Sequence, residues 1–457
     1  MGYFTMRRIT HTAADAGDQL QQLCRQLSLQ ADVVSPRSKA LTERVFGQAL
    51  TPAQVVDRIC SEVREQGLPA VLRYTEQLDK VRLTPQTLRV GATEINAAHK
   101  AAKPAFLETI RRVRNHILSF QMGLVHRDAI LTKRDHHELR MRYQPIRRVG
   151  VCVPGGTAAY PSSILMTVCP AQAAGVKEIA LVMPPTKTGA NNPDLLATCK
   201  ELGVNEVYRV GGAQAVAALA YGVDGLKAVE MIVGPGNIFV TLAKKYVFSQ
   251  VAIDCLAGPS EIVVLADDSA SPEYVAADLI AQAEHDPASS ILITWHEPLV
   301  DQVEAALDRQ LAKLPRGELA RACLEKFGAL VLARDPTQAI AWTNRIAPEH
   351  LHLATKNADK LVDKIEHAGA IFVGHCAPVA LGDYAAGPSH VLPTGGTARF
   401  ASGLSANDFL RRTSIMTFTL QGLEALAGDV RVLAEKEGLT AHSASVDIRM
   451  KGKPPAA

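Results

Sequence analysis

Residues 149–156 read VGVCVPGG, a short apolar, β-branched run that ends in a Pro-Gly-Gly turn. The same arrangement recurs at Ile179–Met183, Glu206–Val210 and Met231–Val233, and Gly or Pro closely follows each run. Helical patterns such as Ala213–Tyr221 lie between the runs. Short runs that alternate with helices predict βαβ units, in which helices cover both faces of a parallel sheet.

A second series of strand-like runs follows, again separated by helical patterns. Its members are Glu261–Ala266, Ile291–Trp295, Ala329–Ala333, His350–Ala354 and Ala370–Val373. We therefore expect an α/β fold with two tandem, incomplete Rossmann-like parallel-sheet units. An N-terminal helical region precedes them, and a C-terminal helical extension follows.

The flanking segments have mainly helical patterns. Residues 12–30 form an amphipathic pattern, Thr51-Pro52 is typical of a helix start, and a third pattern covers 103–121. Regularity stops at 374–405, and a loop this long inside a domain usually serves a site. Beyond that loop we expect two helices, at Asp408–Arg412 and Leu420–Glu437, and one short strand at Ser445–Arg449.

Composition restricts the class of protein. A chain of 457 residues with 47% hydrophobic and 21% charged residues is typical of a globular protein of two or three domains. The formal net charge of +3 gives no indication of nucleic-acid binding. The eight cysteines form no C-x-x-C pair, as expected for reduced thiols. No run resembles a signal peptide or reaches membrane-spanning length, so we expect a cytoplasmic protein that binds neither nucleic acid nor membrane.

Three glycine-rich turns follow strands of the first series: residues 154–156, residues 211–214 with Gln214, and residues 234–237 with Asn237. Such turns let a backbone approach phosphate at the carboxyl ends of parallel strands. The fingerprint G-x-G-x-x-G is absent, because Phe239 stands where its last glycine would be. Ordinary βα turns and a nucleotide site both remain open.

Gln282 and His285 lie three residues apart at the end of a predicted helix that stops at Pro287. They should project from one face, where a neutral imidazole can ligate a metal. A surface histidine that satisfies the last helix carbonyls is the alternative.

Glu349 and His350 stand together where a strand begins. An imidazole that takes a proton from a hydroxyl and a carboxylate that activates water could divide such a task. Regular pleating, however, would direct the two side chains apart.

Further polar candidates follow in the chain: Asp383 and His390 in the glycine-rich loop, and Glu437 and His442 around a predicted helix C-cap. Two His, one Asp and one Gln would make a mixed nitrogen and oxygen ligand set that suits Zn²⁺ or Mn²⁺. The basic cluster of Arg140, Arg142, Arg147 and Arg148 is expected to be a solvated face, with attraction of an anionic cofactor as the alternative.

From about Leu41 to the C-terminus the sequence resembles the histidinol dehydrogenases. The segments that carry the resemblance are residues 153–156, 210–215, 234–237, 257–261, 282–285, 348–351, 382–384, 390–394 and 439–442. Two positions differ from the family's usual pattern: Cys152 replaces a Tyr that contacts NAD, and Ser389 replaces an Asn.

The resemblance implies a role for each matching residue. One Zn²⁺ per subunit would be held by Gln282, His285, Asp383 and His442, which thereby also bind substrate. The other substrate contacts would be Ser260, His350, His390 and Glu437. His350 would be the base for alcohol oxidation, Glu349 would activate water, and Gln214 and Asn237 would contact NAD.

The implied reaction is the four-electron oxidation of L-histidinol to L-histidine through L-histidinaldehyde, with two NAD and water, at the end of histidine biosynthesis. The family also implies a homodimer in which Glu437 and His442 serve the partner's site. A zinc and NAD-dependent dehydrogenase of another diol or amino alcohol is the first alternative. A metal hydrolase or a non-catalytic α/β binding protein is the second.

Pattern and resemblance together predict five regions. They are an N-terminal helical arm (1–50), a helical region packing on the second α/β unit (51–140), the first α/β unit on the NAD side (141–258), the second α/β unit with the metal and catalytic residues (259–380), and the active-site loop with a dimer-swapped extension (381–457).

Overall fold

The computed structural model describes residues 4–27, 36–134, 136–156, 158–285 and 287–452. The chain forms two compact units: residues 1–124 with 147–409, and residues 125–146 with 410–457. The first unit contains both parallel sheets, and the second contains an antiparallel sheet with two helices. The α/β fold class is therefore confirmed, and the five-part division stays a prediction.

The first parallel sheet has the strand order β6-β5-β4-β7-β8. Its strands are β4 (Arg148–Cys152), β5 (Glu178–Met183), β6 (Glu206–Arg209), β7 (Met231–Val233) and β8 (Ala252–Ile253). Its crossover helices are α8 (Pro161–Ala174), α9 (Pro193–Glu201), α10 (Gly212–Tyr221) and α11 (Ile238–Val247). The four predicted strands are confirmed, whereas the short β8 was not predicted.

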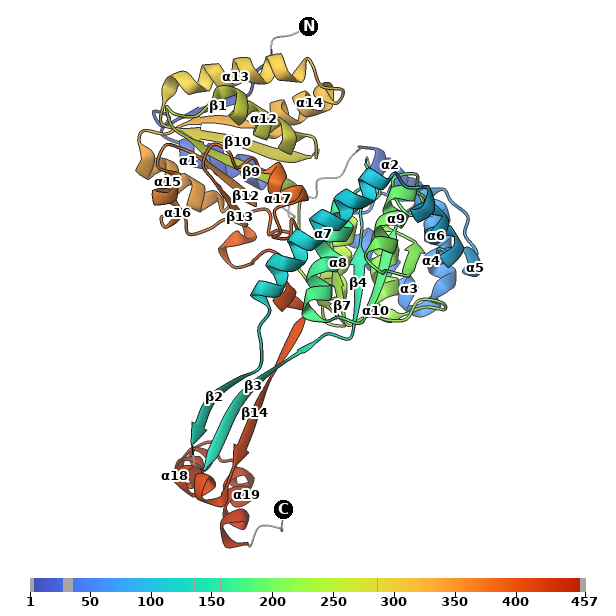
Figure 1. Cartoon of the computed structure of the whole chain (residues 1–457), viewed down its shortest axis with the longest axis vertical. Coiled ribbons are helices and arrows are strands. Elements are labelled where there is room, and N and C mark those ends of the chain that lie inside the picture. The colour runs from blue at the N-terminus through green and yellow to red at the C-terminus, as the bar shows by residue number, and fades with distance from the viewer. Residues whose placement is uncertain (1–3, 28–35, 135, 157, 286, 453–457) are drawn as a thin grey trace. The chain divides into compact units, whose positions relative to one another are not determined.

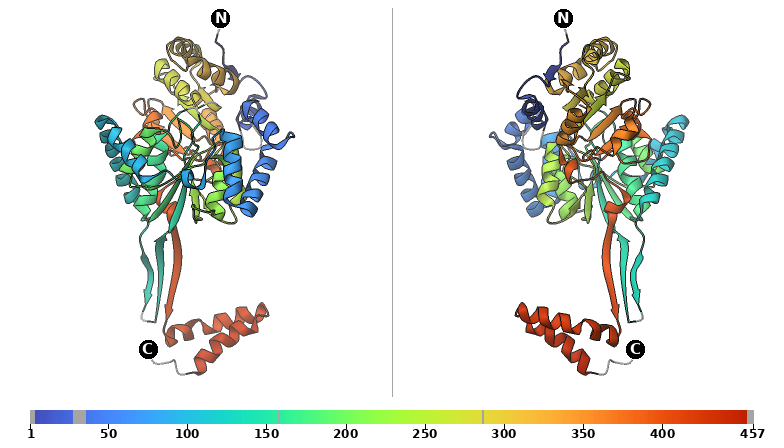
Figure 2. Two further views of the ribbon diagram at one scale, coloured as in Figure 1. Left: turned by 90° about the vertical axis from the view of Figure 1, so that its right-hand side faces the viewer. Right: turned by 90° about the vertical axis from the view of Figure 1, so that its left-hand side faces the viewer.

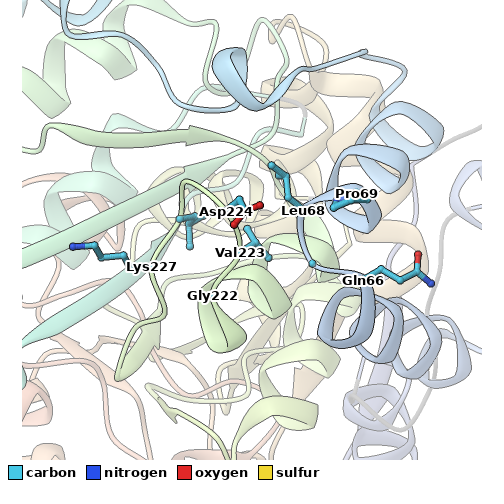
Figure 3. A pocket seen from close by; sticks show the side chains of 9 residues that line it. Gln66, Leu68, Pro69, Gly222, Val223, Asp224 and Lys227 are labelled. Carbon is cyan, nitrogen blue, oxygen red and sulfur yellow. The ribbon is translucent and has the colours of Figure 1, made fainter.

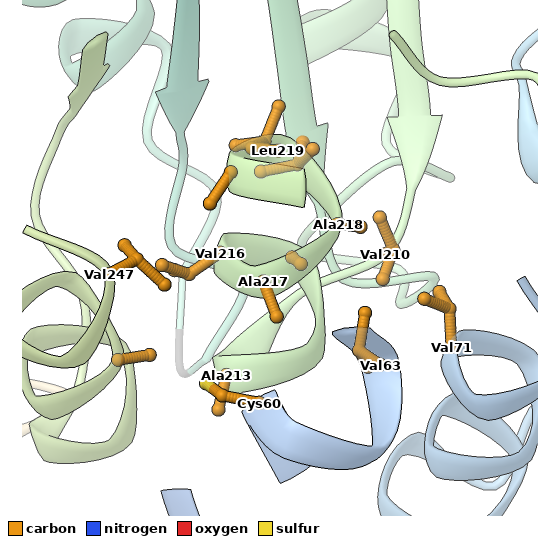
Figure 4. Close-up of a cluster of buried hydrophobic side chains, with 14 of the residues drawn as sticks. Cys60, Val63, Val71, Val210, Ala213, Val216, Ala217, Ala218, Leu219 and Val247 are labelled. Atoms are coloured by element: carbon orange, nitrogen blue, oxygen red, sulfur yellow. The ribbon is translucent and has the colours of Figure 1, made fainter. Parts of the chain in front are cut away.

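Helix α10 is buried along its length because it is built of small residues (Figure 4). It packs against the sheet, α11, and the helices α3 (Pro52–Gln66) and α4 (Leu68–Asp79). A Cβ at Gly150 of β4 would lie 2.8 Å from Cδ1 of Leu219, so a larger residue at this position would force the Leu219 side chain of α10 to shift. Alanine on the helix and glycine on the strand together fix the spacing of the layers.

The N-terminal helices confirm two sequence predictions. Thr51 caps α3: Gln54 N donates to Oγ1 of Thr51, and Thr51 N donates to Oε1 of Gln54. The pattern over 103–121 forms α7 (Pro104–Leu124). The remaining helices here are α2 (Pro36–Phe46), α5 (Pro85–Leu88) and α6 (Ala92–Ala101).

The second parallel sheet has the order β1-β11-β10-β9-β12-β13. Its strands are β1 (Arg7–Thr10), β9 (Ser260–Ala266), β10 (Ala288–Thr294), β11 (Ala329–Leu332), β12 (His350–Ala354) and β13 (Ala370–Val373). One face carries α12 (Pro272–Ala283), α13 (Glu297–Leu311) and α14 (Gly317–Phe327), and the other carries α1 (Ala16–Arg25), α15 (Pro336–Ile346) and α16 (Ala358–Val362) (Figure 1). The five predicted strands are confirmed.

The N-terminal segment differs from its sequence pattern. Helix α1 covers the middle of the predicted 12–30 pattern, and residues 28–30 of that prediction lie outside the described residues. Strand β1 was not predicted, because its sequence RRIT has no apolar run. It forms an edge strand next to β11, where charged side chains remain in water.

The second unit consists of β2 (Ala129–Arg134), β3 (His137–Pro145) and β14 (Leu410–Phe418), followed by α18 (Leu420–Lys436) and α19 (Thr440–Lys451) (Figure 2). The helix predicted at Asp408–Arg412 is wrong: a short 3₁₀ turn, Ala406–Phe409, leads into β14. Strand pairing decides this, because β14 pairs with β3 along its whole length.

The strand predicted at Ser445–Arg449 is also wrong, because these residues belong to α19. That helix packs against α18, where Arg431 Nε lies 2.6 Å from Oδ1 of Asp447. The helix predicted at Leu420–Glu437 is confirmed as α18. Among the residues that the structure describes, no helix has the length and apolar character needed to span a membrane.

The predicted solvated face is wrong for Arg148. Its guanidinium is buried and pairs with Glu206 at 2.7 Å and with Glu178 at 3.1 Å. Glu178 lies on the neighbouring strand β5 and Glu206 on β6 beyond it, so Arg148 neutralises both carboxylates across the amino edge of the sheet. Arg147, by contrast, is exposed.

A buried ion pair supports the glycine-rich turn after β7. Lys244 of α11 contacts Asp254, and both side chains are at most 3% exposed. Lys244 Nζ donates to the carbonyl of Gly234 at 3.1 Å, and the amide of Gly234 donates to Oδ2 of Asp254 at 2.7 Å. The pair therefore holds both polar groups of one glycine.

We predict that Lys244→Met lowers the free energy of unfolding by about 3–5 kcal/mol, because Asp254 would remain buried without its counter-charge. Urea unfolding followed by circular dichroism measures the change. The matched control is Arg334→Ala, which removes the exposed pair with Asp335 and should change stability by about 0–1 kcal/mol. Equal losses in the two variants would contradict the prediction.

Candidate active site

Parallel pairing of β9 with β12 brings distant polar residues together. His350 is registered with Ile262, so the beginnings of the two strands lie side by side. Ser260 and Glu261 open β9, and Glu349 directly precedes β12. Helix α12 returns to the same edge of the sheet and ends at Ala283, next to Gln282. The site therefore lies at the amino ends of these strands.

A chain of hydrogen bonds joins these residues. Nε2 of Gln282 donates to Oγ of Ser260 at 2.6 Å, and that hydroxyl donates to Oε2 of Glu349. The amide of Glu261 donates to the same carboxylate oxygen at 2.9 Å. Glu349 is thus fixed in orientation by two donors on the neighbouring strand.

Burial keeps the Glu349 carboxyl protonated at neutral pH. The residue is 6% exposed, and desolvation raises its pKa to about 8, although Ser260 and the Glu261 amide favour the ionised form. A carboxyl with a pKa near neutrality can both accept and return a proton.

His350 lies between two carboxylates. Its Nδ1 is 3.7 Å from Oε2 of Glu349, and its Nε2 is 3.7 Å from Oδ1 of Asp383. The ring is 4% exposed, and desolvation lowers its pKa more than Asp383 raises it, which keeps the imidazole neutral. The expectation from pleating was wrong for this pair, because Glu349 precedes the strand and does not follow its alternation.

Asp383 comes from the predicted glycine-rich loop, on the short helix α17 (Ala380–Tyr384). A Cβ at Gly382 would lie 2.6 Å from Cζ of Phe372, so α17 crosses β13 closely only because this residue is glycine. Nδ1 of His390 lies 2.9 Å from the carbonyl oxygen of Asp383, which folds the loop back on itself. Desolvation also lowers the pKa of His390.

His285 follows the last turn of α12 and is exposed. Desolvation by the surrounding protein lowers its pKa, Asp383 opposes this, and His350 adds to the lowering. Asp383 and His350 are therefore close enough to His285 to act on its charge. A neutral imidazole is the form that ligates metals.

The predicted NAD contacts, Gln214 and Asn237, lie at the starts of helices that follow strands of the first parallel sheet. Gln214, in the first turn of α10, is 1% exposed, and its Oε1 has no hydrogen-bond partner in the described part of the chain. Its Nε2 lies 3.5 Å from Oδ2 of Asp79. Asn237 is exposed and caps α11 by accepting from the amides of Phe239 and Val240.

Glu437 and His442 belong to the second unit. Glu437 is the C-cap of α18, and His442 lies in the first turn of α19. Both are exposed. Within the described ranges, no group of three or more His, Cys, Asp or Glu side chains could hold a metal ion. Of the predicted ligand set, the first unit supplies only His285 and Asp383 from these residue types, together with the amide of Gln282.

A pocket of about 430 Å³ lies elsewhere in the first unit, between the α3–α4 junction and the turn after α10 (Figure 3). It is lined by Gln66, Gly67, Leu68, Pro69, Gly222, Val223, Asp224, Leu226 and Lys227. None of the candidate catalytic or ligating residues lines it.

Sequence reasoning missed Glu261 and the pair of His352 with Asp278. Glu261 is buried, its Oε1 accepts from Gly395 N at 2.9 Å, and desolvation raises its pKa to about 8. Its position next to Ser260 was the only signal in the sequence. The alternation of His350 and His352 on β12 could have indicated a shared face.

The second parallel sheet carries a buried acid next to a neutral imidazole, and glycine-rich turns follow strands of the first parallel sheet. Together these features define an α/β enzyme equipped for proton transfer. The family model described as histidinol dehydrogenase matches residues 46–450. The chain is 58% identical over 438 residues to a histidinol dehydrogenase of Rhodopirellula baltica, covering 96% of this chain and 95% of that protein. It is 47% identical over 419 residues to a histidinol dehydrogenase of Syntrophotalea carbinolica, and the match covers 89% of this chain and 97% of that protein.

A solved structure agrees. The crystal structure of histidinol dehydrogenase from Elizabethkingia anophelis has a TM-score of 0.88 and 32% identity to this chain, and the match covers 99% of both chains. The chain belongs to the histidinol dehydrogenase family and is an oxidoreductase.

The buried Glu261 carboxyl should make stability depend on pH. Its pKa is 4.5 ordinarily and about 8 when folded, so the folded protein binds more protons and loses stability as the pH rises between these values. We predict that metal-free Glu261→Gln, which cannot ionise, melts about 2 °C or more above the original protein at pH 8.5 and gains nothing at pH 4.5.

Thermal unfolding at several pH values checks this. The matched control is Glu273→Gln, because Glu273 is exposed and its pKa is lowered by Arg309. The control should show no gain at high pH. Parallel melting curves for Glu261→Gln and the original protein across this range would contradict the assignment.

Proposed function

We propose that the chain oxidises L-histidinol to L-histidine through L-histidinaldehyde, a four-electron reaction that uses two NAD and water. The observation that supports this proposal most directly is the buried arrangement of Glu349 and His350, at the end of the hydrogen-bond chain that starts at Gln282. The family membership supports the choice of substrate.

The first oxidation needs a base for the alcohol. His350 is neutral and buried, so it can take the hydroxyl proton while the carbon loses a hydride. When bound, NAD would supply the hydride acceptor for each oxidation, and zinc would supply a Lewis acid that orients the substrate. Asp383, at 3.7 Å from Nε2, stabilises the imidazolium that results.

The second oxidation needs water to add to the aldehyde. In its ionised form, which prevails above its pKa of about 8, Glu349 can take the proton of that water, and the hydrate then loses the second hydride of the reaction to become the acid. Ser260 holds the carboxylate by donating to Oε2. Burial of both groups excludes competing water between the two steps.

The donor set fits a zinc site. Nε2 of Gln282 donates to Ser260, which leaves its carbonyl oxygen free for a metal. His285 supplies a neutral imidazole and Asp383 a carboxylate. With His442 they would complete the mixed nitrogen and oxygen set that suits Zn²⁺, and Mn²⁺ as the alternative.

The first sheet supplies support for NAD binding. Gln214 is buried with an unpartnered carbonyl oxygen among the described residues, beside the turn that contains Gly211 and Gly212. A buried acceptor of this kind lacks a donor until a ligand supplies one. Asn237 would contact NAD from the turn that contains Gly234.

The second unit supports the proposal of a homodimer. Large apolar side chains are exposed on β14, α18 and α19, as follows: Met416, Phe418, Leu420, Leu426, Val430, Val432, Leu433, Leu439 and Ile448. Apolar patches of this kind mark protein interfaces. We propose that a second copy covers them and that Glu437 and His442 serve the partner's site. A cytoplasmic location is part of the same proposal.

We predict two NADH per L-histidinol, read from absorbance at 340 nm, with added Zn²⁺. His350→Asn should lower kcat for the alcohol by about 10²–10⁴-fold, because the base is lost. Glu349→Gln should slow the oxidation of L-histidinaldehyde by a similar factor and leave the first hydride transfer largely intact.

The control is His367→Asn, because His367 lies before β13 and pairs with the exposed Glu366, so this variant should keep normal rates. NADH formed from another amino alcohol but none from histidinol would favour a different dehydrogenase on this scaffold. No NAD reduction with any alcohol would favour a hydrolase or a binding protein.

We predict that Leu433→Glu with Ile448→Glu yields a monomer with little activity, because both side chains are more than 60% exposed in the single chain and would meet the partner. Light scattering coupled to size exclusion measures the mass. Lys436→Glu on the exposed surface of α18 is the matched control. A mass unchanged by the double substitution would contradict the proposed interface.

A further inference from the structure

A buried histidine next to the catalytic residues connects three segments of the chain: its own strand β12, helix α12 and the turn at Gly374. Nδ1 of His352 lies 2.7 Å from Oδ2 of Asp278, and Nε2 lies 3.0 Å from the carbonyl oxygen of Gly374. His352 is 2% exposed and Asp278 is 9% exposed. The proposed chemistry uses neither side chain.

The positions of these residues connect them to the site. His350 and His352 are two apart on β12 and therefore share a face of the sheet. Their partners on β9, Ile262 and Val264, pack in the same cluster as the side chains of α12, so this face is the one that α12 covers. The histidine pair thus points towards the helix.

On α12, Asp278 precedes Gln282 by four residues and His285 by seven. Residues with this spacing lie on one face of a helix. The contact with His352 therefore fixes the helix face that carries Gln282, about one turn before this ligand, and with it the helix end that His285 follows. A shift or rotation of α12 would move both ligands.

The third segment starts at Gly374, where the chain leaves β13 with a φ of +85°. Its amide donates to the carbonyl of Leu353 at 3.0 Å, and its own carbonyl accepts from Ala377 N at 3.3 Å as well as from His352. This turn begins the segment that leads to α17 and Asp383. The His352 imidazole therefore contacts both the helix that leads to Gln282 and His285 and the turn that leads to Asp383.

Asp278 favours the charged form of the buried His352 imidazole. Burial lowers the pKa of His352, but Asp278 and the Gly374 carbonyl outweigh burial and raise it overall. A well-packed apolar pair would serve folding equally well, because replacing a buried ion pair by hydrophobic residues is often neutral or stabilising. Stability alone does not explain the pair, whereas the contacts of His352 with Asp278 and with the Gly374 carbonyl do.

We propose that His352 and Asp278 are positioning residues that hold α12 and the Gly374 turn in place, so that Gln282, His285 and Asp383 are preorganised for the metal. This inference rests on the proposed function, because it concerns the same site. Residues that orient metal ligands typically change metal affinity or activity by about 10–100-fold when they are replaced.

The test measures zinc affinity of the full-length protein by competition with a chromophoric chelator. Asp278→Asn, which preserves shape, should weaken Zn²⁺ binding by about 10-fold or more. The double variant His352→Leu with Asp278→Val should melt at or above the temperature of Asp278→Asn and still bind Zn²⁺ weakly. In both variants kcat at saturating Zn²⁺ should fall more than KM for L-histidinol rises.

The matched control is Leu353→Ala, on the same strand but on the opposite, buried face. It should lower the melting temperature and leave zinc affinity unchanged, because that face packs away from α12. If the unaltered protein binds zinc and both variants bind it equally well, the positioning role is overturned. If the unaltered protein binds no zinc, the proposed function fails first.

Discussion

The parallel pairing of β9 with β12 is the constraint on which the site depends. It places Ser260 and Glu261 beside Glu349, residues that are almost ninety positions apart in the chain. A shift by one residue would turn every side chain of β12 to the other face of the sheet. His350 and His352 would then leave the layer that α12 covers, and both the proton-transfer group and its support would be lost together.

Within this frame, burial acts on the acid and on the base in opposite directions. It raises the pKa of Glu349 and lowers that of His350, so both groups are uncharged near neutral pH. Uncharged groups can be adjacent in a dry site without strong repulsion or a large desolvation penalty. The hydroxyl of Ser260 and the amide of Glu261 then orient the carboxyl without forcing it to ionise.

The regular part of the fold could be predicted because its signals are local. Strands such as β4 and β5 are short apolar runs closely followed by Pro or Gly, and the start of α3 is indicated by Thr51 and Pro52. The antiparallel sheet could not be predicted, because β14 becomes a strand only by pairing with β3, about 270 residues earlier. The burial of Arg148 also depends on carboxylates from two other strands.

The candidate site was predictable only in part for the same reason. The sequence indicated Glu349 next to His350, and Gln282 three residues before His285, but no spacing related Asp383 to His350. That relation came from family resemblance, and the structure places the two side chains 3.7 Å apart. His352 escaped notice because its importance depends on Asp278 and Gly374, which meet it only in the folded chain.

The loop that contains His390 relates the two parallel sheets to each other. Ser389 donates to the carbonyl of Met166 on α8, beside the first sheet. A few residues later, Thr394 accepts from the amide of Gly258, and Gly395 donates to Glu261 of the second sheet. The glycine-rich turns lie at the carboxyl ends of the first sheet's strands, whereas the acid and the base lie at the amino ends of the second sheet's strands. In the proposed reaction a cofactor on one edge and a substrate on the other would react only if these edges stay in register, and this loop is hydrogen-bonded to residues beside both.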